Sequence, residues 1–158
     1  METLKKGVIG ISYQFREREL YFLLLHRKKR LEQDWIGWEF PKGTVEEDAI
    51  KGKSLYQNMK DEAKEEANIV KSNIRPLMHN GKHYTYEYVF YRPPETIKKL
   101  MFVYLINVDR SEEIRVNGIE HDRFMWRNYG YTKLFLKKYN LKRTLEIAKK
   151  VITGKYSY

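Results

Sequence analysis

The fold of this chain is decided by two short stretches, WEFPKG at residues 38–43 and DEAKEEANI at residues 61–69. The second stretch predicts a helix on which Glu62, Glu65 and Glu66 project within about 100° of one another. Like charges at this spacing repel, so their convergence indicates that a cation binds between them. Mg²⁺ fits best, because it takes a few carboxylates and keeps water and phosphate on its other positions. Mn²⁺ is the alternative ion.

The first stretch predicts how the backbone comes close to such an ion. Pro41 ends a strand, and Gly43 allows the main chain to approach a ligand or to adopt a positive φ. A strand, a glycine turn, an acidic loop and a carboxylate-bearing helix together indicate metal-assisted chemistry on phosphate groups. For residues 61–69 alone, the alternative is a solvated helix of mixed glutamates and lysines that binds no ion.

Length and composition restrict the kind of protein. The 158 residues fit one domain, residues 1–158, with a sizeable core. No apolar run approaches the ~18 residues of a membrane span, and the N-terminus lacks a signal-peptide pattern. The chain has no cysteine, which excludes disulfides and thiolate-bound zinc. We therefore expect a cytoplasmic protein without a membrane partner.

Positive charge is concentrated at the C-terminal end of the sequence. The formal net charge is +10, from 31 Lys and Arg against 21 Asp and Glu. Residues 123–158 hold ten basic residues and one acidic residue, Glu146, so this tail carries +9. Such asymmetry suggests a polyanionic substrate or partner such as RNA. The alternative is a solvated basic helix that only keeps the protein soluble.

The rest of the pattern predicts strands on both sides of the central helix. Short apolar runs bounded by charged or turn residues favour buried strands. In one of them, alternation places Tyr84, Tyr86 and Tyr88 on the same face. Strands are predicted within residues 6–13, 20–26, 35–40, 69–79, 82–91, 99–108 and 124–126.

Two helices carry recognisable ends. The central helix begins at a capping box, with Ser54 as N-cap and Gln57 three residues later. It ends near Asn68, a residue that tolerates the left-handed C-terminal conformation. A basic amphipathic helix is predicted over about 131–153, with Asn140 as a candidate N-cap.

These stretches resemble the signature of the Nudix hydrolase family. That signature is a glycine, five residues, a glutamate, seven residues, and then Arg-Glu-apolar-x-Glu-Glu-x-Gly-apolar. Gly43 matches its opening glycine, and Glu62, Glu65 and Glu66 match the three glutamates that bind divalent metal in the family. The resemblance implies an α/β protein with the Nudix fold, an α/β/α sandwich with a mixed central sheet.

The chain departs from the signature at three places. Asp61 stands at the arginine position, and Asn68 stands at the second glycine. Four extra residues fall within Asp48–Lys53. The nearest candidates for the early glutamate are therefore Glu46, Glu47 and Asp48.

Within the family, the chain looks closest to asymmetrical diadenosine tetraphosphate hydrolases. Residues 21–25 resemble their second strand, and residues 38–46 resemble their tryptophan–proline–lysine–glycine loop. The pair Glu120-His121 followed by Trp126 resembles a late segment of these enzymes. The Pro-Lys-Gly element also occurs in mRNA-decapping and RNA pyrophosphohydrolase members, so it indicates a nucleotide polyphosphate rather than one compound.

The resemblance assigns roles to individual residues. Hydrolysis of a phosphoanhydride needs charge neutralisation, a positioned water and a proton acceptor, which metals and carboxylates supply. An aromatic side chain is expected to stack on the base, worth ~1–3 kcal/mol. Predicted metal ligands are Glu62, Glu65, Glu66 and the Gly43 carbonyl; predicted catalytic residues are Glu62, Glu65 and Glu120; predicted substrate-binding residues are Lys42, Lys82, His83, Tyr88, Tyr131 and Phe135.

The expected function is Mg²⁺-dependent hydrolysis of diadenosine tetraphosphate to ATP and AMP. One alternative is a decapping or pyrophosphohydrolase activity on RNA 5′ ends, in which the basic tail follows the RNA backbone. A second alternative, suggested by Asp61 and Asn68, is a degenerate domain that binds nucleotide or RNA without hydrolysis.

Overall fold

The centre of the molecule is a mixed β-sheet built around the long strand β1 (Glu2–Arg16). The computed structural model describes residues 2–28, 37–45 and 54–154. Strand β1 pairs in parallel with β9 (Glu95–Asn107) and antiparallel with β2 (Glu19–Arg27), so distant parts of the sequence lie side by side. Within the described residues the sheet has eight strands, and its main path runs β10-β2-β1-β9-β5.

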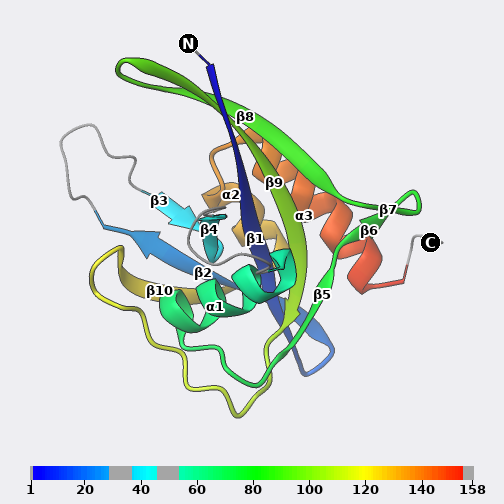
Figure 1. Cartoon of the computed structure of the whole chain (residues 1–158). Helices are drawn as coiled ribbons and strands as arrows, with labels where there is room; N and C mark the ends of the chain where they lie inside the picture. Colours follow the sequence, from blue (N-terminus) through cyan, green and yellow to red (C-terminus); the bar gives the residue numbers. More distant parts are fainter. Residues whose placement is uncertain (1, 29–36, 46–53, 155–158) are drawn as a thin grey trace.

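Three further strands extend this sheet beyond its main path (Figure 1). β3 pairs with β2, β4 pairs with β1, and β8 pairs with β9 in a long hairpin. A separate two-stranded sheet is formed by β6 and β7. The bounds are β3 Gly37–Glu39, β4 Lys42–Val45, β5 Asn73–Pro76, β6 Met78–His79, β7 Lys82–His83, β8 Thr85–Arg92 and β10 His121–Asn128.

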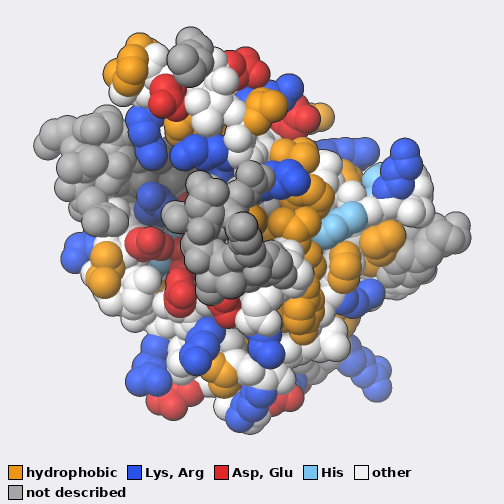
Figure 2. Space-filling view, in the orientation of Figure 1, with side chains coloured by type: hydrophobic (Ala, Val, Ile, Leu, Met, Phe, Trp, Pro, Cys, Tyr) orange, Lys and Arg blue, Asp and Glu red, His pale blue; other side chains and the backbone are white. Residues whose placement is uncertain are grey.

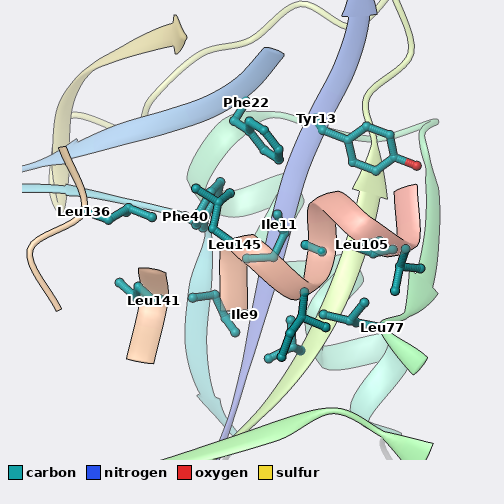
Figure 3. Packing of buried hydrophobic residues seen from close by; sticks show 14 of the residues in the cluster. Ile9, Ile11, Tyr13, Phe22, Phe40, Leu77, Leu105, Leu136, Leu141 and Leu145 are labelled. Carbon is teal, nitrogen blue, oxygen red and sulfur yellow. The ribbon is translucent and has the colours of Figure 1, made fainter. Parts of the chain in front are cut away.

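Helices cover both faces of the sheet. Residues 7–14 of β1 are buried without alternation, as expected for a strand with both faces covered. Helix α1 (Leu55–Ala67) packs on one face through Met59 and Ala63, and α3 (Tyr139–Ile152) packs on the other. Figure 1 shows β1 and β9 passing between these helices, and Figure 3 shows the core beneath α3. The predicted α/β/α sandwich with a mixed central sheet is therefore confirmed.

Ser54 and Asn68 cap α1 as predicted, but the Gln57 side chain donates to Asp61 Oδ1 at 2.9 Å instead of completing a capping box. The Ser54 hydroxyl accepts a hydrogen bond from the Gln57 amide at 3.0 Å. Asn68 adopts φ 60° and ψ 33°, and its amide donates to Ala63 and Lys64 carbonyl oxygens. The caps fix where the helix begins and ends. Which of its glutamates face the sheet depends on the rotation of the helix about its axis.

The C-terminal basic segment forms two helices rather than one. α2 (Tyr129–Phe135) begins at Asn128, whose side chain accepts a hydrogen bond from the Tyr131 amide. α3 begins after Lys138, and Asn140 does not cap it; the Asn140 side chain instead donates to the Glu87 carbonyl oxygen of β8 at 3.0 Å. Among the described helices, none is long and apolar enough to cross a membrane.

Candidate functional site

The face of α1 that meets the sheet also carries two glutamates. Glu66 is only 3% exposed and lies among the buried residues of the helix. Glu62, one turn earlier, is half-buried on the same stripe. Glu65 is exposed on the outer surface, so the structure brings Glu62 and Glu66 together but not Glu65. A role for Glu65 as ligand or base stays a prediction.

Strand β4 lies directly against these two glutamates. A β-carbon on Gly43 would collide with the Glu62 carboxylate and would lie 2.6 Å from Glu62 Cγ. The adjacent Lys42 amide donates a hydrogen bond to Glu66 Oε1 at 2.8 Å. Any side chain at position 43 would therefore displace the Glu62 carboxylate, and glycine leaves room for it.

Glu66, Glu120 and His121 bring three metal-ligating atoms within 4.8 Å of one another. Burial raises the pKa of Glu66 to about 10, and the hydrogen bond with Glu120 and the negative charges of Glu120 and Glu62 act in the same direction. Carboxylates that cannot all ionise in one small space can ionise when a divalent cation is bound between them. The donor set of Glu62, Glu66 and Glu120 therefore fits a hard divalent metal ion.

This group gives the metal-free protein a distinctive pH dependence. The pKa of Glu66 is about 10 in the folded chain and 4.5 unfolded, so the native state holds an extra proton between these values. Stability should therefore fall as pH rises from 5 to 8, by at most about 1.4 kcal/mol per pH unit. Thermal unfolding in EDTA measures this fall, and added Mg²⁺ should reverse it. Glu66→Gln should abolish the dependence; an unchanged slope in that variant would assign the titration to another group.

A second buried carboxylate, Glu39, lies beside this group and is ionised. Burial alone would raise the pKa of Glu39, but the hydrogen bond from His121 and the charges of Lys42 and Arg27 lower it to about 2. The His121 Nε2 lies 2.9 Å from Glu39 Oε2, and Lys42 Nζ and Arg27 each lie 3.5 Å from a Glu39 oxygen. Glu39 therefore links the Pro-Lys-Gly strand to the Glu120-His121 segment.

Cations gather next to the carboxylates. Lys99 of β9 is largely buried, and its ammonium donates to Thr44 Oγ1 at 2.6 Å. Burial and the positive charges of Lys42, Lys5 and Arg92 lower the pKa of Lys99 to about 8, against the attraction of Glu62. Figure 2 shows lysine and arginine side chains beside acidic ones on this face. Such a concentration of positive charge favours binding of a polyanion.

Sequence reasoning missed Lys99, whose side chain passes close to a glycine of a distant strand. A β-carbon on Gly7 would lie 2.9 Å from Lys99 Cε and 3.0 Å from the Gly43 carbonyl oxygen. Gly7 and Lys99 are brought together by the parallel pairing of β1 with β9. This pairing joins segments far apart in the chain, so no local pattern predicts it.

Aromatic side chains of β8 border the cations. Tyr86 and Tyr88 line a pocket together with Lys42, Glu39 and Lys138. Lys138 Nζ lies 5.5 Å from the centroid of the Tyr88 ring. Tyr84, Tyr86 and Tyr88 all pack toward the α3 side, which confirms their predicted common face. The pocket therefore combines aromatic surface with positive charge, as a nucleotide requires.

The other predicted substrate-binding residues lie elsewhere. Lys82 and His83 are on β7, which Figure 1 places across the molecule from β3 and β4. A His83 ring nitrogen lies 2.8 Å from the Val103 carbonyl oxygen, a structural contact. Tyr131 on α2 is 57% exposed, and Phe135 packs against Trp38 with ring centroids 6.3 Å apart. The structure does not bring these four residues to the pocket of Tyr88, and their roles stay predictions.

Glu46, Glu47 and Asp48, the candidates for the early glutamate of the signature, lie outside the described residues.

Comparison with known proteins identifies what this chain is similar to. The model of the NUDIX domain family matches residues 3–145. The crystal structure of a C. elegans Ap4A hydrolase binary complex superposes with a TM-score of 0.69 at 19% identity, covering 95% of this chain and 98% of that one. No curated protein matches the sequence.

Two further solved structures have the same fold. The NUDIX domain of Shewanella oneidensis NrtR, complexed with ADP ribose, has a TM-score of 0.67 at 14% identity and covers 96% of this chain and 89% of that one. The E. coli dihydroneopterin triphosphate pyrophosphohydrolase has a TM-score of 0.68 at 18% identity and covers 91% and 95%. At such identities the likeness shows the fold alone.

Proposed function

The chain belongs to the NUDIX domain family, whose model spans residues 3–145, and on this premise we propose that it hydrolyses a phosphoanhydride bond of a nucleoside polyphosphate. The observation that carries the proposal is that a group of carboxylates lies next to a group of lysines. Glu62, Glu66 and Glu120 gather on one side, and Lys42 and Lys99 lie on the other. Phosphate oxygens and a divalent cation together would neutralise both groups.

Glu62, Glu66, Glu120 and the Gly43 carbonyl oxygen would hold Mg²⁺ or Mn²⁺. When bound, the ion neutralises charge on the phosphates and makes a coordinated water more acidic. Water oxygen forms a bond to phosphorus, the bridging P–O bond breaks, and its electron pair leaves with the departing nucleotide. The proton of the water passes to a carboxylate, for which Glu62 or Glu120 is the candidate.

The remaining residues bind and orient the substrate. Lys42 and Lys99 would contact the non-bridging phosphate oxygens, where charge-assisted hydrogen bonds are strongest. Tyr88, with Tyr86 beside it, would offer a face to the base. Lys42 lines the pocket of these tyrosines, and its amide donates to Glu66, so we expect one ligand to span the aromatic surface and the carboxylates.

The substrate that we propose is diadenosine tetraphosphate, cleaved to ATP and AMP. The sequence resemblance of residues 38–46 and the structural likeness to a C. elegans Ap4A hydrolase support this choice. The test is to incubate the protein and Mg²⁺ with diadenosine tetraphosphate, ATP and ADP-ribose and to separate the products by chromatography. Cleavage of ADP-ribose or ATP in preference to the dinucleotide would reject this substrate. No product with any polyphosphate would support a binding domain without hydrolysis.

A second candidate is hydrolysis at a polyphosphorylated RNA 5′ end. The specific observation is that Lys138, in the basic C-terminal segment, reaches the ring of Tyr88, which connects this segment to the pocket. RNA bound along exposed basic side chains should lose affinity steeply as salt is raised. Turnover of triphosphorylated and capped RNA against diadenosine tetraphosphate at two salt concentrations separates the candidates. A salt-insensitive preference for the dinucleotide would dismiss RNA.

Lys99→Met should lower catalytic efficiency because it removes a hydrogen bond to the polyphosphate of the substrate. A charge-assisted hydrogen bond contributes about 1.5–3 kcal/mol, so we expect kcat/KM to fall about 10- to 150-fold. Lys98→Met is the matched control, because Lys98 pairs with Glu87 at 3.1 Å and is more exposed. Steady-state kinetics and thermal unfolding of both variants test the prediction. Equal kinetic effects of the two substitutions would mean that Lys99 does not contact the substrate.

A further inference from the structure

His121 is a buried histidine at the centre of the carboxylate group. Its side chain is 0% exposed, and one of its ring nitrogens lies within 4.8 Å of carboxylate oxygens of Glu66 and Glu120. Ligands at about 2.1 Å from an octahedral ion are separated by about 3 Å when adjacent and about 4.2 Å when opposite. The limit of 4.8 Å is only slightly larger than the separation of opposite ligands, so small side-chain rotations would bring the three residues onto one ion.

Glu39 determines which nitrogen of His121 carries the hydrogen. The Nε2 atom lies 2.9 Å from Glu39 Oε2, and a Glu39 carboxylate that also pairs with Arg27 and Lys42 can only accept a hydrogen bond. The hydrogen therefore belongs on Nε2, and Nδ1 keeps a free lone pair. Within the described part of the chain, Nδ1 has no hydrogen-bond partner although it is buried. A buried polar atom without a partner is costly and calls for an explanation.

We propose that His121 Nδ1 is a direct ligand of the divalent ion held by Glu66 and Glu120, and that Glu39 orients the ring. A metal-bound histidine almost always donates its other N–H to a carboxylate or carbonyl, and the Glu39–His121 contact has this form. Lys42 and Arg27 lie 3.5 Å from Glu39 and hold its charge. The inference rests on the proposed metal site but not on the identity of the substrate.

A nitrogen ligand changes which ion the site prefers. Mg²⁺ selects oxygen ligands, whereas imidazole suits ions further along the divalent series. The site should therefore bind Mn²⁺ or Co²⁺ more tightly than carboxylates alone would, relative to Mg²⁺.

Pulsed EPR of the full-length protein loaded with Mn²⁺ alone is the direct test. A coordinated imidazole couples its ¹⁴N nucleus to the electron spin, so the wild type should show ¹⁴N modulation. His121→Gln is the decisive variant, since its amide can still donate to Glu39 but has no atom in place of Nδ1. This variant should lose the modulation and bind Mn²⁺ at least tenfold more weakly, with a smaller loss for Mg²⁺. His79→Gln, on the distant β6, should retain the signal.

Glu39→Gln gives an independent readout. Removing the carboxylate that orients a metal-bound histidine typically weakens metal affinity 10- to 100-fold, so Mn²⁺ should bind more weakly while the ¹⁴N modulation persists. If the wild type binds Mn²⁺ without ¹⁴N modulation, the histidine ligand is refuted but the carboxylate site stands. If calorimetry detects no binding of Mn²⁺ or Mg²⁺ to the wild type, both the inference and the proposed function fail.

Discussion

Glu66→Gln is expected to abolish hydrolysis while leaving the fold intact. Glu66 is 3% exposed, and its pKa of about 10 means that it is protonated in the metal-free protein at neutral pH. Glutamine has the shape of a protonated glutamate, and its amide oxygen can still accept the hydrogen bond from the Lys42 amide. The substitution therefore replaces a neutral group by another neutral group in the folded chain.

The effect on activity should be large because glutamine cannot become an anion when metal arrives. Loss of a residue that only supports a ligand costs 10- to 100-fold in metal affinity or activity, so loss of the ligand itself should exceed 100-fold in kcat/KM. Activity assays and metal titration with Mg²⁺ measure this loss, and thermal unfolding in EDTA checks the fold. Glu113→Gln, on an exposed loop, is the matched control. Wild-type turnover in Glu66→Gln would remove Glu66 from the metal site.

Helix α1 could be predicted in detail because its determinants are local. Ser54 and Asn68 act within one turn of their own positions, so the helix ends follow from the sequence. The period of 3.6 residues also predicts that Glu62 and Glu66 share a face. The same period could not decide whether Glu65 faces inward. Glu65 is three positions after Glu62, and the rotation of the helix about its axis is fixed by the packing of Met59 and Ala63.

The second half of the site could not be read from local pattern because long-range pairing creates it. Lys99 reaches Thr44 only because β9 lies beside β1, which also pairs with β4. The contact of Glu39 with His121 joins β3 to β10 across β2. A pattern of residues predicts neither strand order nor register, so the contacts of Lys99 with Thr44 and of Glu39 with His121 could not be predicted. The position of His83 likewise depends on pairing, since it lies in the small β6–β7 sheet, and its predicted role in substrate binding stays a prediction.

The C-terminal segment shows how a local cap can override a general pattern. An amphipathic stripe and many basic residues predict one helix over about 131–153. Asn128 starts α2 earlier by accepting a hydrogen bond from the Tyr131 amide, and extended backbone at Leu136 ends it. The interruption allows Lys138 to reach Tyr88, so it shapes the pocket as well as the helices.

Gly43→Ala is expected to lower activity strongly while changing the stability of the fold only slightly. A methyl group at this position would occupy the space of the Glu62 carboxylate. The colliding atoms belong to the end of a flexible, half-buried side chain, which can rotate away at small cost in folding free energy. Glu62 would then leave its place beside Glu66.

The displaced carboxylate should cost about 100-fold in kcat/KM, since a misplacement of about 1 Å at a reacting centre has effects of this size. The melting temperature in EDTA should change by only a few degrees. Gly130→Ala is the matched control, because its added carbon meets only Asn128 Oδ1 at 3.8 Å and its helical position favours alanine. That variant should keep full activity. Full activity in Gly43→Ala would show that hydrolysis does not require Glu62 in its observed position, and large unfolding would show that Gly43 serves packing rather than the site.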